Sequence, residues 1–186
     1  MQLTKVEVCQ LKELLLSCTN TITCMSLFLN EVQDQELKAI LTKQFPLHID
    51  DYNMKAEFLK EEMGPNGQLQ VPEQISIDLN LGEKTSVQPV LPNTNVTKLN
   101  DREIATNYLL TLKRAGKEYA WAAMEASQPK LRQFLKDAFT MACNHAYEVW
   151  DWMAKHQYYG ICPEPKVDLN EAASIFEIIP TDTMTS

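Results

Sequence analysis

Residues 100–160 have the sequence NDREIATNYLLTLKRAGKEYAWAAMEASQPKLRQFLKDAFTMACNHAYEVWDWMAKHQYYG. Apolar side chains recur every three or four residues on both sides of Gln128-Pro129, and this period predicts two amphipathic helices joined by a tight turn. Asn100 or Asp101 is suited to cap the first helix, which we expect to end at about Ser127. The second helix is expected to end at about Tyr159. The segment is therefore predicted to be a helical hairpin.

Each helix of this hairpin carries one stripe of residues predicted to be buried. The stripe of the first helix is rich in alanine, which lets a neighbouring helix approach closely. The second helix adds larger aromatic side chains. The two predicted stripes are Ile104, Tyr108, Leu112, Ala115, Tyr119, Ala122 and Ala126, followed by Leu131, Leu135, Ala138, Ala142, His145, Val149 and Trp152.

Residues 1–64 are predicted to form a first hairpin of the same kind. One helix is expected from about Thr4 to Glu31, and a second from the N-cap Asp34 to Met63. Pro46 lies inside the second helix and predicts either a kink or a break near Phe45, because proline lacks the N–H that an inner helical turn needs. The predicted stripes are Val8, Leu11, Leu15, Cys18, Ile22, Met25, Leu29 and Val32, then Leu37, Leu41, Phe45, His48, Tyr52 and Leu59.

Residues 65–99 are rich in glycine, proline, asparagine and threonine, and are predicted to be a crossover loop. Helices of about 28 residues are ~42 Å long, so a connection running the length of a bundle must be long. The alternation of Ile75, Ile77, Leu79 and Leu81 predicts an extended segment with one side on the bundle, and leaves a short strand open.

The tail, residues 161–186, contains a single apolar run at residues 175–179. We expect this run to pack back onto its own chain. Docking onto another subunit is the alternative.

The two hairpins resemble one another in sequence, at a spacing of 94 residues. A long crossover between two similar helical hairpins is the layout of the ferritin-like four-helix bundle. We therefore expect an all-α, ferritin-like fold in a single domain over residues 1–186. The matching positions are Asn30-Glu31, Leu37-Lys38, Leu41 and Phe45 in the first hairpin, and Met124-Glu125, Leu131-Arg132, Leu135 and Phe139 in the second.

Composition excludes several classes of function. A net charge of -8 and a pI near 4.9 argue against binding to nucleic acid. Apolar runs stay well short of the ~20 residues that span a bilayer, and the first residues lack the apolar centre of a secretory signal, so synthesis in the cytoplasm is expected. The five scattered cysteines suggest neither disulfides nor a zinc site, and those in helices are expected to be buried.

The second hairpin also resembles the Coat F domain of Bacillus-type spore coat proteins. The resemblance covers about a third of the chain, and the first hairpin matches more faintly, as a degenerate copy would. It implies a ferritin-like bundle in an endospore-associated protein, located in the spore coat, and it brings no catalytic motif. The segments that carry it are D-R-E-I-A from Asp101, Y-A-x-A-x-x-E from Tyr119, Q-P-x-L-R-x-x-L from Gln128, H-A-Y-E-x-W-x-W-M from His145, and Tyr158-Tyr159-Gly160.

A ferritin-like fold raises the question of a di-iron site, which needs Glu-x-x-His pairs and further glutamates facing inward. No Glu-x-x-His occurs in this chain. The reversed order occurs twice, as His48-x-x-Asp51 and His145-x-x-Glu148. We expect no metal there: His145 is predicted to bond a tyrosine or Glu148, and His48 a carbonyl freed by Pro46.

Other chemistry is not indicated by the sequence. It has no glycine-rich phosphate loop and no G-x-S-x-G motif, so we predict neither an enzyme nor a cofactor. The leading hypothesis is a non-catalytic spore coat protein that associates with other coat proteins or with itself as a homo-oligomer. The first alternative is a degenerate ferritin-like protein that binds a metal or a small apolar ligand. The second is a helical adaptor that binds a peptide along its loop or tail.

Overall fold

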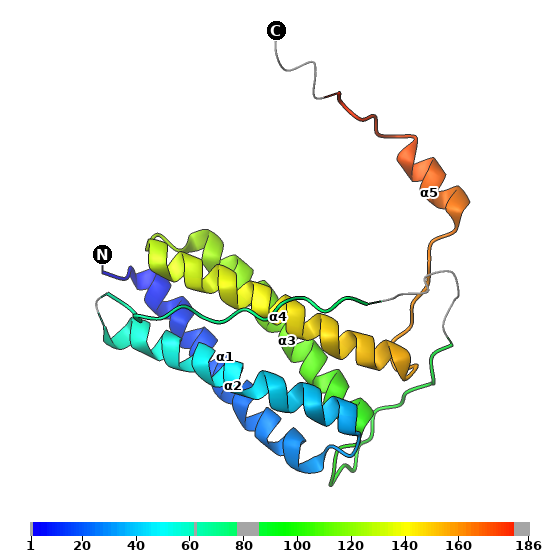
Figure 1. The fold of residues 1–186 in the computed structure, drawn as a ribbon, viewed down its shortest axis with the longest axis horizontal. Coiled ribbons are helices and arrows are strands. Elements are labelled where there is room, and N and C mark those ends of the chain that lie inside the picture. The colour runs from blue at the N-terminus through cyan, green and yellow to red at the C-terminus, as the bar shows by residue number, and fades with distance from the viewer. Residues whose placement is uncertain (1, 62, 78–85, 181–186) are drawn as a thin grey trace.

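The structure, a computed structural model, describes residues 2–61, 63–77 and 86–180, and these form α-helices without strands. The four long helices lie side by side in a bundle, and the short fifth helix lies away from it (Figure 1). The prediction of an all-α fold with two helical hairpins is confirmed. The helices are α1 (Lys5–Glu31), α2 (Gln35–Lys60), α3 (Asp101–Glu125), α4 (Pro129–Lys155) and α5 (Lys166–Ala173).

The long helices begin where the sequence provides N-caps. Asp34 accepts a hydrogen bond from the backbone N–H of Leu37, and Asn100 forms a reciprocal capping box with Glu103. Pro129 occupies the first turn of α4, where its missing N–H has no cost. These caps confirm the predicted starts.

α2 continues through Pro46 as one helix, as predicted, so the alternative of a break near Phe45 is wrong. It ends at Lys60, three residues before the predicted end at Met63. Gly64 then turns the chain with φ of 67°, and a Cβ added there would lie 2.5 Å from the Phe58 ring. Glycine is therefore the residue that this turn requires.

Backbone contacts at one end of the bundle fix the direction of the second hairpin. The Asp101 carboxylate accepts hydrogen bonds from the backbone N–H groups of Gln33 and Asp34, and Glu31 accepts one from Leu99. The start of α3 thus lies beside the turn between α1 and α2. Because α2 begins at that turn, α2 and α3 run parallel, and the chain between them must return along the bundle, as in the ferritin-like layout.

The first part of the crossover packs on the bundle. In Figure 1 it runs lengthwise across α4. Leu69 is buried, and the Asn144 side chain of α4 donates a hydrogen bond of 2.7 Å to the carbonyl of Pro72. Ile75 and Ile77 are half-buried in irregular chain, so the open possibility of a strand is not realised at these two residues. Leu79 and Leu81 lie outside the described residues.

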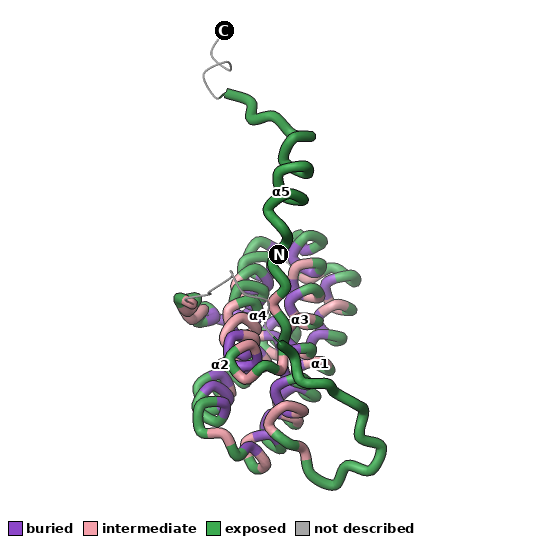
Figure 2. Tube along the Cα trace, turned by 90° about the vertical axis from the view of Figure 1, so that its right-hand side faces the viewer, coloured by how far each residue is buried: buried purple, intermediate pink, exposed green. Residues whose placement is uncertain are grey.

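The tail does not follow the prediction. Figure 2 shows its described part extending away from the bundle and exposed. Ile178 is 94% exposed and Phe176 78% exposed, so the expectation that this run packs back onto its own chain is wrong. The run is preceded by α5, which the sequence analysis did not predict.

The predicted stripes hold best in the second hairpin. All of their residues in α3 and α4 are buried except Ala115, which is half-buried. In α1 half of the predicted stripe is buried as expected, namely Leu11, Cys18, Met25 and Val32. At the other predicted positions the buried side chain is the preceding residue, as at Leu14, Thr21 and Phe28, while their successors are half-buried. In α2 the predicted Leu59 is exposed, and its neighbour Phe58 is buried instead.

Glu7 joins the opposite end of the bundle. Its carboxylate is fully buried and accepts hydrogen bonds from the backbone N–H groups of Thr4 (2.6 Å), Ser127 (2.8 Å) and Gln128 (2.9 Å). Burial raises the pKa of Glu7, but these hydrogen bonds outweigh burial and lower the pKa to about 2. One carboxylate therefore ties the start of α1 to the turn between α3 and α4.

We predict that Glu7→Gln destabilises the fold by about 2 kcal/mol, because a neutral amide cannot replace a carboxylate that accepts several N–H groups. Urea unfolding followed by circular dichroism measures the loss. Glu13→Gln, an exposed change on the same helix, is the control and should alter stability little. Equal stability of the two variants would contradict the role of Glu7.

Candidate functional site

A layer of polar side chains crosses the middle of the bundle. It separates two apolar clusters, one around Leu11, Phe134 and Leu135, and the other around Met25, Tyr108 and Trp152. All four long helices contribute to the layer. We call it the polar layer, and it consists of Cys18, Gln44, His48, Asp51, Lys55, Tyr108, Tyr119, His145 and Glu148.

The first half of the polar layer is built around Asp51 and Lys55, which lie one turn apart on α2 with fully buried side chains. The Lys55 Nζ lies 2.5 Å from the Asp51 Oδ2. The Tyr119 hydroxyl from α3 donates to the same oxygen at 2.6 Å and accepts from Lys55 at 2.8 Å. The Cys18 thiol from α1 donates to it at 2.9 Å. A single carboxylate oxygen thus joins three helices.

Electrostatics explain why this carboxylate stays charged in the core. Burial raises the pKa of Asp51, but the Lys55 ammonium and the donors Cys18 and Tyr119 outweigh burial, and the pKa is lowered from its ordinary value. Burial and the negative charge of Asp51 raise the pKa of the Cys18 thiol to about 11. The thiol therefore stays protonated at neutral pH and acts as a hydrogen-bond donor.

The second half of the polar layer is a chain of hydrogen bonds that leads to the surface. The Tyr108 hydroxyl donates to the Gln44 Oε1 at 2.7 Å, and the Gln44 amide donates to Glu148 at 2.9 Å. Lys43, half exposed, pairs with Glu148 at 2.8 Å. Because the Tyr108 proton is used by Gln44, the His48 Nε2, which lies 2.8 Å from Tyr108, must be the donor in that pair.

His145 packs beside His48, with ring centroids 5.2 Å apart. It is buried, and among the described residues neither of its ring nitrogens has a hydrogen-bond partner. The predicted bond to a tyrosine or Glu148 is therefore wrong, because Glu148 turns toward Lys43 and Gln44. Burial lowers the pKa of His48 to about 4 and that of His145 to about 3.

The structure brings together only part of the predicted metal-ligand set. His48 and His145 meet, but Asp51 belongs to the ion pair with Lys55 and Glu148 to the hydrogen-bond chain. The part of the chain that the structure describes contains no group of three or more His, Cys, Asp or Glu side chains placed to hold a metal. A cavity of about 10 Å³ beside Cys18, His48 and Tyr119 has room for about one water molecule.

Two central residues of the layer, Gln44 and Lys55, were missed in the sequence. Lys55 follows His48 by seven residues and Asp51 by four, and Gln44 precedes His48 by four, so all share one helix face. That spacing indicates that Gln44 and Lys55 lie on the same buried helix face as His48 and Asp51. The cysteine prediction also needs correction: Cys18 is buried, but Cys9 and Cys143 are exposed.

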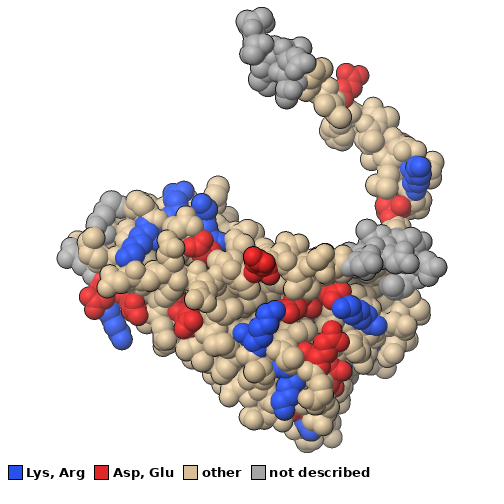
Figure 3. Space-filling view, viewed as in Figure 1, with Lys and Arg blue, Asp and Glu red and all other residues tan. Residues whose placement is uncertain are grey.

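The surface agrees with the charge of the sequence. On the face seen in Figure 3, basic side chains are interspersed with acidic ones, as expected for a chain of net charge -8. No described helix is long and apolar enough to cross a membrane.

We predict that Lys55→Met destabilises the protein by about 3–5 kcal/mol, because it leaves the Asp51 charge buried without its cation. Adding Asp51→Leu and Tyr119→Phe should recover most of the loss, since the whole charged group is then replaced by apolar side chains. Chemical denaturation of the three proteins measures both effects. Lys60→Met, at an exposed lysine of the same helix, is the control. A single variant as stable as this control would contradict the prediction.

We also predict that stability falls as the pH drops from 6.5 to 4.5. Both buried histidines have pKa values in the folded state below the ordinary 6.5, so below pH 6.5 the unfolded chain binds protons that the folded chain does not. Their stabilising contribution is complete above pH 6.5 and is lost as the pH falls toward 4 and 3, at about 1.4 kcal/mol per pH unit for each histidine.

His145→Leu should halve this slope and leave stability at pH 7.5 equal or higher, because leucine needs no hydrogen-bond partner. Urea unfolding at intervals of half a pH unit measures the slope. The window stays above pH 4.5 because carboxylates such as Glu7 begin to contribute below it. An unchanged slope in His145→Leu would contradict the assignment.

The second hairpin matches a known protein family, and a relative matches most of the chain. The model of the Coat F domain matches residues 100–161, which comprise α3, α4 and the turn between them. The protein named spore coat protein F-like protein YhcQ, from Bacillus subtilis (strain 168), is 24% identical over 157 residues, covering 84% of this chain and 71% of its own.

A crystal structure from Bacillus halodurans C-125, described as that of a candidate spore coat protein, superposes with a TM-score of 0.64. It covers 89% of this chain and 95% of its own, and at 14% identity the likeness concerns the fold. The predicted resemblance is confirmed: residues 100–161 match the Coat F domain, and the chain is similar over most of its length to a protein named as spore coat protein F-like.

Proposed function

We propose that this chain is a non-catalytic structural protein of the spore coat, which acts by associating with other coat proteins or with further copies of itself. The observation that carries the proposal is the Coat F domain match, together with a relative named as spore coat protein F-like over most of the chain. Both relate the chain to the coat in general. The part of the proposal that concerns catalysis rests on the polar layer.

Most polar groups of the layer are hydrogen-bonded to one another; among the described residues the exceptions are the Asp51 Oδ1 and both His145 ring nitrogens. Asp51, Lys55 and Tyr119 are buried and share their protons and lone pairs within the layer, and Cys18 holds its proton at neutral pH. A nucleophile or base must be reached by its substrate. The adjoining cavity of about 10 Å³ is too small for any substrate larger than water. The layer is therefore suited to position four helices rather than to react.

The alternative of a metal-binding ferritin-like protein has less support. Only His48 and His145 approach one another, and a transition metal in such a bundle needs several further ligands. The two carboxylates that would complete the set are held by Lys55 and by Lys43 with Gln44. We accordingly assign His48, Asp51, His145 and Glu148 a structural role.

The proposal predicts where the protein is found during sporulation. A fluorescent fusion of the full chain, expressed in sporulating Bacillus subtilis, should form a shell around the forespore and remain with the coat fraction of purified spores. The fluorescent protein alone is the control and should stay diffuse in the mother cell. A fusion that stays equally diffuse and is absent from coat extracts would overturn the proposal.

A further inference from the structure

Two gaps run along the bundle between its hairpins, and only one of them is covered by another segment of the described chain. The gap between α2 and α4 is covered by the crossover, through buried Leu69 and the bond from Asn144 to Pro72. The gap between α1 and α3 lies open as a groove of about 740 Å³. An extended apolar segment is thus the means by which this fold closes one gap, and the other has no such segment in the described structure.

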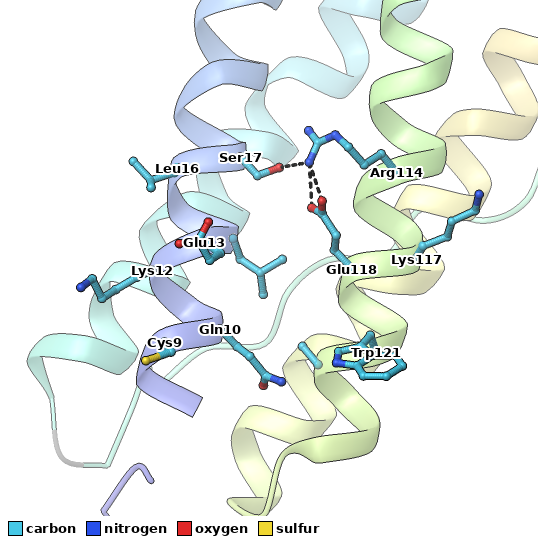
Figure 4. Close-up of a pocket in the computed structure, with 12 residues that line it drawn as sticks. Cys9, Gln10, Lys12, Glu13, Leu16, Ser17, Arg114, Lys117, Glu118 and Trp121 are labelled. Atoms are coloured by element: carbon cyan, nitrogen blue, oxygen red, sulfur yellow. Dashed lines mark hydrogen bonds and ion pairs between the residues drawn. The ribbon is translucent and has the colours of Figure 1, made fainter. Parts of the chain in front are cut away.

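The open groove is apolar at its floor and charged at its rim. Figure 4 shows Gln10 of α1 extending toward Trp121 of α3, with Leu16 on the outer side of α1, away from α3. The floor of the groove includes Leu14 and Ala122. Trp121 is 71% exposed and Leu16 66% exposed. Large apolar side chains in an open groove commonly mark an interaction surface. Its charged lining residues are Lys12, Arg114 and Lys117 against Glu13 and Glu118, an excess of one positive charge.

The tail of the chain is apolar and acidic, and in both respects it complements the groove. Its apolar run, Ile175, Phe176, Ile178 and Ile179, is 72–94% exposed and resembles in spacing the Ile75 and Ile77 segment of the crossover. The tail as a whole carries five acidic residues and one lysine: Glu164, Asp168, Glu171, Glu177 and Asp182 against Lys166. It therefore offers an acidic segment with an apolar strip to a groove that has an apolar floor and a slightly basic rim.

The tail and the groove of one chain lie toward opposite ends of the bundle. The tail follows α4, whose end contacts the start of α3 through Tyr158 stacked on Arg102 at 5.0 Å. The groove is lined from α3 by residues 114–122, some 12–20 residues further along, or ~18–30 Å at 1.5 Å per residue. In the structure the tail extends away from the four-helix bundle (Figure 1). The tail is therefore positioned to contact a neighbouring molecule.

We propose that the apolar run of the tail binds in the α1–α3 groove of a second copy of this chain. The inference deepens the proposed function, since it names one partner for a protein that acts by association. Two copies that exchange tails reciprocally form a closed dimer, whereas a one-way exchange builds an open chain of copies. The contact rests on burial of the apolar run against Trp121 and the apolar floor of the groove, with the charges favouring its orientation.

Analytical ultracentrifugation of the full-length protein tests the proposal. We expect the wild type to self-associate, and Ile178→Asp in the tail and Trp121→Ala in the groove each to weaken association at least tenfold. Both side chains are exposed, so neither change should unfold the bundle, which circular dichroism checks. The matched controls are Val90→Asp in the crossover (Val90 68% exposed) and Met63→Ala (Met63 71% exposed), which should associate as the wild type does.

Cross-linking identifies whether the contact joins two chains. In a background with Cys24, Cys143 and Cys162 replaced by serine, one chain keeps Cys9, which lines the groove, and a second chain carries Cys9→Ser and Ser174→Cys. Mixing the two with a short bis-maleimide should give a product of two chains. A single chain that carries both cysteines serves to detect a contact within one molecule.

Three results would overturn the proposal: a protein that stays monomeric at all concentrations, association that Ile178→Asp and Trp121→Ala leave unchanged, or a cross-link found only within one chain. None of them bears on localisation to the coat, which the fluorescent fusion reports separately. Failure of the tail contact is thereby distinguished from failure of the proposed function.

Discussion

The ion pair between Asp51 and Lys55 is the interaction on which the centre of this bundle depends. Two opposite charges with fully buried side chains are stable only with close geometry and further hydrogen bonds, and here Tyr119 and Cys18 supply them. Because those partners come from α3 and α1, the register of three helices is tied to one carboxylate oxygen. An apolar core of the same volume would tolerate sliding of the helices more easily, so the pair contributes specificity of packing more than net stability.

The two histidines of the same layer have fewer hydrogen-bond partners than the ion pair. His48 finds Tyr108, whereas both nitrogens of His145 lack a partner among the described residues. On the Asp51 side the Oδ1 also lacks a partner among the described residues, but the charge is held by Lys55 through the Oδ2. Acid sensitivity is therefore concentrated at the two histidines, since protonating either ring introduces a charge that burial disfavours.

Much of the fold could be predicted from the sequence, because caps and helical periodicity are local signals. The stripes of α3 and α4 were right almost residue by residue, while the stripe of α1 was right at every second position and one residue late at the others, because apolar side chains flank its buried face. The polar layer was predicted only in part: His48, Asp51, His145 and Glu148 were noticed, but a buried lysine is rare enough that Lys55 was passed over. The exposed tail could not be predicted from local pattern, because apolar runs usually find cover within their own chain.

The composition of the polar layer also determines which fragments of this protein keep their buried hydrogen bonds. The Coat F match ends at the borders of the second hairpin, yet Tyr108 and Tyr119 in that hairpin have their partners Gln44, His48, Asp51 and Lys55 in the first. A recombinant fragment cut at residues 100 and 161 would keep the tyrosines and lose every one of these partners. We therefore expect the unit that folds cooperatively to extend beyond the Coat F match and to include the first hairpin, which supplies these partners.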